Sequence, residues 1–340
     1  MIWHIVAWSV LALLAAAAIT SMFGVSSRTL LALANDGLPY VLLLAWPITL
    51  VAIFASAWSL ACAGAALVAY HLALIIPRVR SDQVPRWVVD APRFDLSVAN
   101  VYVDNKTPEA MARQIVSCGA DVVVIAEWND RFGAAFDAAG AKEIFPHRIC
   151  NDCDNSAYVV TVASKLPLEK ESQVVTVGPL IITHAVITCG SRHVGVLAVH
   201  PTAMVDPGGY PEWKAQLDAL LGYIRTVDGP FVIAGDFNST RFRPEFQRLL
   251  HAGLIDAHDT LGRGLSASFR LAATGALAAA GTIVRLDHAL LSDGVWPVVA
   301  NDLDSCGSDH VPFKLTLAVR QTTKVPPAGS SDAVMSRSTM

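Results

Sequence analysis

The sequence predicts an α/β fold in four layers, two packed mixed sheets flanked by helices, preceded by about three transmembrane helices. From Phe94 onward, short β-rich segments that are apolar or alternating outnumber the helical ones. Strands in quantity with helices dispersed among them favour an α/β sandwich. Hydrophobic residues make up 53% of the 340 residues and charged residues 16%, which is too apolar for an ordinary soluble enzyme.

The apolar excess lies at the amino end. Ile2–Phe23 contains no Asp, Glu, Lys or Arg and is long enough to cross a hydrocarbon core of roughly 30 Å. The charge-free stretch Pro39–Pro77 is too long for one span, so we expect two helices folded back near Ala55–Ser59. A cleaved signal peptide is the alternative for the first stretch, but its apolar part exceeds the usual ~7–15 residues and no basic residue precedes it.

These observations divide the chain into four regions. Residues 1–77 are expected to form a membrane anchor, and residues 78–93, with several charges and two prolines, a solvated linker. Residues 94–320 have the length and patterning of one catalytic domain, and residues 321–340 are expected to be a disordered tail.

The expected elements of the catalytic domain follow from periodicity and turn residues. The strands are Leu96–Val103, Val122–Ala126, Tyr158–Ala163, Leu180–Ile187, His193–Val199, Phe231–Ala234, Ala289–Leu291 and Phe313–Val319. The helices are Pro108–Cys118, with Thr107 as its N-cap, Trp213–Arg225 and Pro244–His251. Ala272–Ala280 is expected to be a surface loop or a short helix.

Three motifs contain the residue types that phosphate and proton chemistry need. Gly235-Asp236-Phe237-Asn238 follows an apolar strand, and period-two alternation places Asp236 and Asn238 on one side of the chain. Ser308-Asp309-His310 offers a carboxylate for a hard cation beside a group that titrates near neutral pH. An Asp287 held against His310 would fix the imidazole tautomer, whereas His288, on the opposite face, is interpreted as structural.

In this order the three motifs closely resemble the endonuclease/exonuclease/phosphatase (DNase I-like) superfamily, of which the chain looks like a bacterial, membrane-anchored member. The superfamily includes nucleases, sphingomyelinases and inositol-polyphosphate phosphatases. Its further elements have counterparts here in Asn100, Glu127, His200 and, more approximately, the pair Ser164-Lys165. Lys165 stands where Arg is usual and Ala126 where Gln is frequent, and both departures are peripheral.

The resemblance implies a role for each position. Glu127 would bind Mg²⁺ or Mn²⁺ with support from Asn100 and Asp309, since oxygen and amide ligands suit a hard divalent ion. The catalytic set would be His310, Asp287, Asp236, Asn238 and His200, and the substrate-binding set Asn238, His200, Ser164 and Lys165. The implied activity is hydrolysis of a phosphodiester or phosphomonoester by a metal-activated water, with the bilayer and a phosphate ester such as a lipid headgroup or a nucleotide-like compound as partners.

Two other functions stay open. A nuclease acting on DNA or RNA is possible in this superfamily, but the catalytic region carries 18 Lys and Arg against 25 Asp and Glu, a formal charge of −7, which does not favour nucleic acid. A membrane-tethered module that binds a phosphate ligand without turnover is the other alternative.

The side of the inner membrane on which the domain lies is a separate question. Arginines after Pro77 favour the cytoplasm by the positive-inside rule. Resemblance to bacterial three-span relatives favours the periplasmic side instead. Cys150-x-x-Cys153 agrees with that side if it is a local disulfide, whereas two free thiols would imply nothing; a redox pair is a further alternative, and half a zinc site is disfavoured because no second CxxC or nearby HxxxH completes it. We expect a multi-pass inner-membrane protein with an exported domain.

Overall fold

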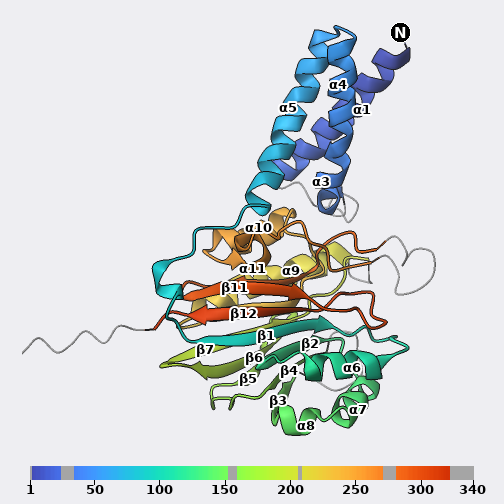
Figure 1. Ribbon diagram of the computed structural model, residues 1–340. Coiled ribbons are helices and arrows are strands. Elements are labelled where there is room, and N and C mark those ends of the chain that lie inside the picture. Colours follow the sequence, from blue (N-terminus) through green and yellow to red (C-terminus); the bar gives the residue numbers. More distant parts are fainter. Residues whose placement is uncertain (1, 24–33, 152–158, 206–208, 271–280, 322–340) are drawn as a thin grey trace, which may run out of the picture.

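Two six-stranded mixed sheets form the centre of the protein (Figure 1). The computed structural model describes residues 2–23, 34–151, 159–205, 209–270 and 281–321. The first sheet has the order β11 (Val295–Asp302), β12 (Phe313–Val319), β1 (Arg93–Asn100), β2 (Val122–Ala126), β4 (Val160–Ser164), β3 (His147–Cys150). The second has the order β5 (Gln173–Val177), β6 (Leu180–Cys189), β7 (Arg192–Val199), β8 (Phe231–Asp236), β10 (Asp287–Leu291), β9 (Ile255–Asp256).

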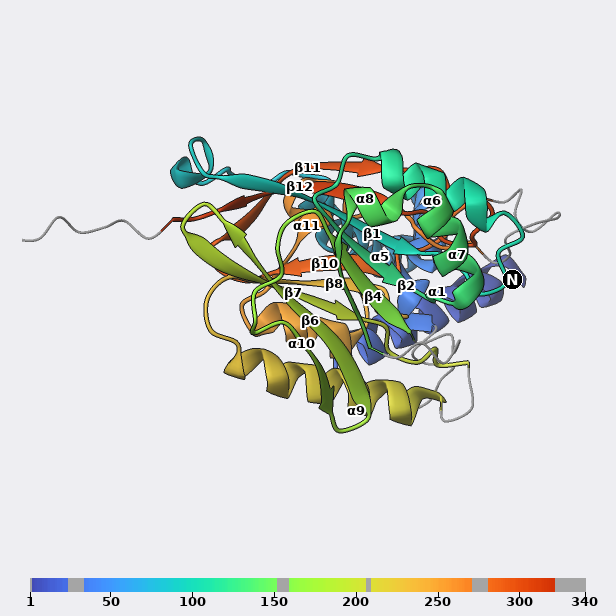
Figure 2. The same ribbon diagram turned by 90° about the horizontal axis from the view of Figure 1, so that it is seen from below.

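Helices cover the outer face of each sheet, which completes the predicted four layers (Figure 2). α6 (Pro108–Ser117), α7 (Asp130–Ala138) and α8 (Ala141–Ile144) pack on the first sheet through Met111, Phe132 and Phe136. α9 (Gly209–Tyr223) and α10 (Pro244–His251) pack on the second through Trp213 and Phe246, which share a core with Phe237 after β8. A third core of aliphatic residues, among them Leu96, Val124 and Val196, fills the space between the sheets.

Among the described strands, each sheet contains one parallel pair, β1 with β2 and β7 with β8, while every other pairing is antiparallel. Carboxyl ends of parallel neighbours meet at one edge of a sheet. β10 runs antiparallel to β8 in a register that sets Asp287 opposite Asp236. The polar residues at these strand ends are therefore gathered at one end of the sandwich.

The elements predicted for the catalytic region are present, with shifted ends. β2, β12 and α10 have the predicted bounds, and α9 begins at Gly209, four residues earlier than expected. Thr107 is the N-cap residue of α6, as predicted, but its side chain makes no capping hydrogen bond, because its hydroxyl donates to the carbonyl of Cys306. Tyr158, Cys153, Ala272–Ala280 and the tail from residue 322 lie outside the described residues.

Four strands were missed. β5 is a largely exposed edge strand, β3 is half-exposed, and β9 has two residues. β11 contains Pro297 and a register shift between Pro297 and Val299. None of the four has the buried apolar run or regular alternation that identifies a strand from sequence.

Apolar helices extend from one end of the sandwich (Figure 1). They are α1 (Ile2–Met22), α3 (Leu38–Val41), a 3₁₀ turn (Leu42–Leu44), α4 (Ala45–Phe54) and α5 (Trp58–Ile75). Ile2–Met22 and Trp58–Arg78 are long and apolar enough to cross a membrane, whereas the apolar helix Leu38–Phe54 is shorter. The expected fold-back falls between Phe54 and Trp58, but of the three expected spans only two reach full length among the described helices.

Candidate active site

Four polar residues stand where the parallel strands end. Asn100 is the last residue of β1 and Glu127 follows β2; His200 follows β7 and Asp236 ends β8. The Asn100 amide nitrogen donates to Glu127 Oε1 at 2.8 Å and to Asp236 Oδ2 at 3.0 Å. Asn100 therefore ties a carboxylate of the first sheet to one of the second.

Gly235 allows β7 and β8 to approach closely beside Asp236. Its φ is +144°, and a Cβ there would lie 2.0 Å from the carbonyl oxygen of Val199. Only glycine fits this backbone without displacing β7. Asp236 then caps the turn that follows, because its Oδ1 accepts from the backbone N–H of Asn238 at 2.7 Å.

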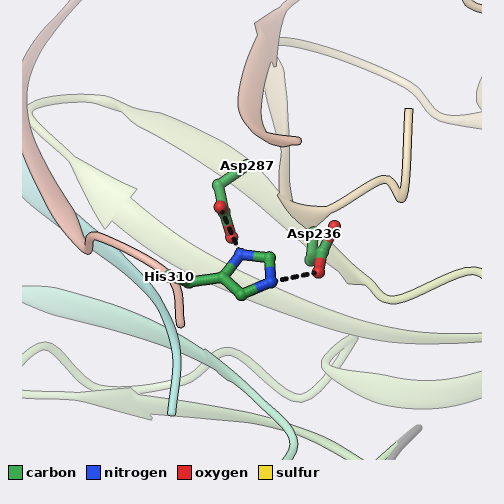
Figure 3. A group of neighbouring side chains, drawn as sticks. All are labelled: Asp236, Asp287 and His310. Carbon is green, nitrogen blue, oxygen red and sulfur yellow. Dashed lines mark hydrogen bonds and ion pairs between the residues drawn. The ribbon is translucent and has the colours of Figure 1, made fainter. Parts of the chain in front are cut away.

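His310 lies between two buried carboxylates (Figure 3). Its Nδ1 is 2.7 Å from Asp287 Oδ2 and its Nε2 is 3.5 Å from Asp236 Oδ2. All three residues are at most 4% exposed. The arrangement is the one expected from the sequence, with Asp287 orienting the imidazole and leaving Nε2 directed at the strand end that carries Asp236.

The charges of this group are mutually stabilised. Burial lowers the pKa of His310, but Asp287 and Asp236 outweigh it and raise that pKa to about 10. Burial raises the pKa of Asp287, and His310, Ser268 and Arg285 outweigh it, so that pKa lies below its usual value. His310 is therefore an imidazolium at neutral pH, held between anions.

Glu127 is held in a strained backbone conformation. Its φ is +60°, which costs a residue other than glycine about 1 kcal/mol or more. Both carboxylate oxygens are engaged, Oε1 by Asn100 and Oε2 by the backbone N–H of Val103 at 2.7 Å. Strain at an oriented acidic residue is typical of functional sites.

Asp309 adds a second acidic group. Burial raises its pKa to about 6, with the negative charges of Glu127 and Asp236 acting in the same direction against His310. Its Oδ1 is buried without a hydrogen-bond partner among the described residues. An unpartnered carboxyl oxygen near other carboxylates fits a hard divalent cation, whose charge would remove the repulsion.

Two groups could hold such a cation. Asp236, Asp287 and His310 have ligand atoms within 4.8 Å of one another. In that group His310 already pairs with both carboxylates, and Asp287 Oδ1, like Asp309 Oδ1, has no hydrogen-bond partner among the described residues. The side of the site with Glu127 and Asp309 fits a cation better, because the negative charge of Glu127 raises the pKa of Asp309 and a cation would remove that repulsion. Asn100 offers that side its amide nitrogen, while its Oδ1 accepts from the Tyr102 N–H at 2.9 Å. In this arrangement Asn100 orients Glu127 and does not present an oxygen ligand.

His200 and Asn238 form a second group of polar side chains, next to Asp236. The Asn238 amide nitrogen is 3.3 Å from His200 Nε2 and donates to the Pro201 carbonyl at 2.9 Å. His200 Nε2 is in turn 3.6 Å from Asp236 Oδ2. These side chains supply donors to a phosphate next to Asp236.

Ser164 and Lys165 do not join the site, which corrects the prediction for them. β4 runs antiparallel to β2, and Ser164 pairs with Val122 at the far end of β2 from Glu127. Val122 and Glu127 are five residue steps apart, roughly 17 Å along an extended strand. The Ser164 hydroxyl donates to the Leu166 carbonyl, and the Lys165 ammonium lies 5.8 Å from the centre of the Phe145 ring.

His288 has a partner of its own away from the site. Its Nδ1 is 2.7 Å from Asp256 Oδ2, and both side chains are 2% exposed. Asp256 also caps α11 (Ala257–Thr260) by accepting from the N–H groups of His258 and Asp259. The structural interpretation of His288 agrees with this position.

Ser268 and Phe269 are site residues that the sequence did not indicate. The Ser268 hydroxyl donates to Asp287 Oδ2 at 2.6 Å, and the Phe269 ring lies 5.1 Å from the His310 ring. Both belong to a non-repetitive segment that pairs by isolated bridges with Val284 and His310. Nothing in the local pattern distinguished them from an ordinary loop.

Comparison with known proteins agrees with this geometry. Residues 98–310 match the model of the Endonuclease/Exonuclease/phosphatase family. No curated protein matches the chain.

Solved structures share the fold at low identity. They include humanized D. rerio TDP2 with 14 mutations (18% identity, TM-score 0.54, 67% of this chain and 99% of that one). The endonuclease/exonuclease/phosphatase from Beutenbergia cavernae DSM 12333 gives 16% identity and TM-score 0.53 over 67% of this chain and 72% of that one. D. rerio TDP2 complexed with single strand DNA product gives 17% and 0.53 over 67% and 99%.

The match spans more than half of the chain and contains every site residue from Asn100 to His310. The chain therefore belongs to the endonuclease/exonuclease/phosphatase family, and it is a hydrolase acting on phosphoester bonds.

Proposed function

We propose that this protein is a membrane-anchored, divalent-metal-dependent phosphoesterase. The observation that supports this most directly is the convergence of His310, Asp287, Asp236, Asn100 and Glu127 at one end of the sandwich. The anchor comprises residues 1–77, the linker residues 78–93 and the catalytic domain residues 94–320. The linker runs along the domain, since the Asp82 N–H donates to the Thr260 carbonyl and the Gly264 N–H to that of Arg78.

In this proposal Glu127 and Asp309 hold Mg²⁺ or Mn²⁺, with Asn100 positioning Glu127. The cation, when bound, supplies positive charge that stabilises the anionic phosphate. Asp236 and the two polar residues next to it act on the substrate directly. Asn238 and His200 bind the phosphate oxygens, and Asp236 orients the attacking water and accepts its proton.

His310 stabilises charge in this scheme. As an imidazolium it has no free lone pair with which to act as a base, but it stabilises the negative charge that grows on phosphate. Asp287 keeps the ring in place. Overall, the water oxygen bonds to phosphorus, the P–O bond to the leaving group breaks with its electron pair, and the leaving oxygen takes up a proton. The products are a phosphate monoester and an alcohol, or free phosphate from a monoester.

A nuclease is the second candidate, because one solved neighbour, D. rerio TDP2, is complexed with single strand DNA product. The formal charge of −7 on residues 94–320 weighs against it, since nucleic-acid affinity depends on basic surface. We also propose that the chain is a multi-pass inner-membrane protein with the domain on the periplasmic side; reporter fusions after Val319 test that orientation.

The test of the activity is a substrate panel on the full chain in detergent with Mg²⁺. The panel contains bis-nitrophenyl phosphate, a single-stranded oligonucleotide, RNA, sphingomyelin and phosphoinositides. We expect hydrolysis of at least one phosphoester that stops on addition of EDTA and returns with Mg²⁺. Hydrolysis that EDTA leaves unchanged contradicts the metal assignment, and a His310→Ala variant with full activity contradicts the site.

A further inference from the structure

An apolar cavity lies between the catalytic domain and the membrane anchor. Its volume is about 970 Å³, at the upper end of the roughly 300–1,000 Å³ typical of small-molecule sites. The anchor contributes Gly37 and Tyr40 to the walls, and the domain contributes mostly small or apolar side chains such as Ala203, Met204 and Ala267. The two parts of the chain thus line one cavity that is open to the outside.

The cavity reaches the catalytic residues. Asn238, which contacts His200, lines it, and so does Phe269, whose ring lies 5.1 Å from that of His310. Leu286, the neighbour of Asp287, lines it as well. A molecule that fills this space therefore contacts Asn238 and the Phe269 ring that packs against His310.

The anchor wall is fixed to the domain. The buried Asp36 carboxylate accepts from Arg243 Nε and from the Thr240 hydroxyl, both at 2.7 Å. The Tyr40 hydroxyl donates to the carbonyl of Ile283. These contacts hold the first residues of α3 against the strand-end loops, so the cavity is part of the folded chain.

The same wall continues onto a helix surface suited to lipid. Tyr40, Leu43 and Leu44 are 49%, 54% and 53% exposed although they are apolar or amphipathic. The helices that follow are free of charged side chains as far as Pro77. Large apolar side chains are also exposed on the two described helices long enough to span a bilayer, among them Leu13 and Ile19 of α1 and Trp58 of α5, and such side chains are expected to face hydrocarbon.

We propose that this cavity holds an acyl chain of a membrane phospholipid, and that the substrate is a lipid phosphoester whose phosphate lies at His310. This rests on the proposed function and names its substrate class. The chain would pass from the bilayer along Tyr40 into the cavity. The charged side chains of the wall, Asp36 and Arg243, pair with each other, so the cavity offers a nucleic-acid backbone no free cation among the residues that the structure describes as its lining.

The first test measures how rate depends on chain length. The substrates are methyl, butyl and octyl 4-nitrophenyl phosphodiesters, given to the full chain in detergent with Mg²⁺. Each buried methylene contributes about fourfold to binding, so kcat/KM should rise by up to roughly 60-fold from methyl to butyl. Hydrolysis of all three compounds at equal kcat/KM overturns the lipid inference and leaves the phosphoesterase proposal standing.

Variants that narrow the cavity test whether the dependence of kcat/KM on chain length arises in this cavity. Ala203→Phe and Ala267→Phe alter two different walls, and each is expected to lower the octyl-to-methyl ratio of kcat/KM by about tenfold or more. Ala215→Phe is the matched control, because Ala215 is exposed on α9 and is not among the cavity-lining residues. An unchanged ratio in both cavity variants contradicts the inference.

A second test needs no turnover. The full chain is placed in nanodiscs of phosphatidylethanolamine and phosphatidylglycerol containing phosphatidylglycerol with a diazirine on one acyl chain. We expect photolabel on Leu265–Phe269, reduced in Ala267→Phe. Label confined to the outer surfaces of α1, α4 and α5, or displacement of cavity label by a single-stranded oligonucleotide, overturns the inference. Cavity labelling in a chain that hydrolyses no phosphoester would contradict only the proposed activity.

Discussion

Replacing Asp287 with Asn separates chemistry from stability, because the domain contains two buried His–Asp pairs of equal length. His310 and Asp287 are 2.7 Å apart at the site, and His288 and Asp256 are 2.7 Å apart outside it. All four side chains are at most 5% exposed. Asp256→Asn is therefore a matched control for Asp287→Asn.

The expected magnitudes follow from burial. Breaking a buried ion pair by removing one charge costs about 3–5 kcal/mol. If that energy orients and charges His310 for the reaction, Asp287→Asn lowers kcat by roughly two to three and a half orders of magnitude, at 1.36 kcal/mol per factor of ten. Asp256→Asn removes a comparable interaction from the fold alone. It should lower the Tm by about 6–20 °C, at 2–4 °C per kcal/mol, with kcat per folded molecule within about twofold of wild type.

The assay is hydrolysis of bis-nitrophenyl phosphate by the full chain in detergent, normalised to the folded fraction, with thermal unfolding followed by circular dichroism. Asp287 has no catalytic role if Asp287→Asn retains kcat within threefold while its Tm falls as in Asp256→Asn. An equal loss of kcat in both variants would also contradict that role, because the two pairs would then be functionally equivalent.

Three further predictions concern metal, pH and backbone. Glu127→Gln keeps the acceptor for Asn100 and removes the charge, so activity at low Mg²⁺ should fall about 100-fold and recover in part at high Mg²⁺; equal activity at all concentrations would exclude Glu127 as a ligand. Burial lowers the pKa of His258 well below 6.5, so the unfolded chain binds a proton at this residue more readily than the folded chain does. The free energy of unfolding should therefore decrease as the pH falls below 6.5, by up to about 1.4 kcal/mol per pH unit. Urea unfolding of wild type and His258→Leu between pH 7 and 5 should show a shallower slope in the variant. Gly235→Ala should destabilise the domain by about 3 kcal/mol or more, seen as a Tm drop; an unchanged Tm would contradict the close approach to Val199.

Local sequence determined the elements whose patterns are strong. Phe313–Val319 and Val122–Ala126 were predicted with their observed ends, because the first alternates apolar and polar residues and the second is a short apolar run rich in β-branched residues, and both patterns are typical of strands. Pro244–His251 begins at Pro and ends before Gly253, which are signals carried by the residues themselves. Strand β11, which has no such pattern, owes its strand conformation to pairing with β12.

The sequence by itself indicated most of the candidate site residues, because carboxylates, amides and imidazoles follow the predicted strands in a recognisable order. Only tertiary structure decided which of them meet. Strand direction placed Ser164 at the far end of β2 from Glu127, and the register of β10 on β8 brought Asp287 level with Asp236. The tertiary structure also placed Ser268 and Phe269 in contact with Asp287 and His310, and it placed Tyr40 in the lining of a cavity that Asn238 lines as well. Such contacts join residues tens to hundreds of positions apart, and a local pattern contains no information about which distant segment will pack against it.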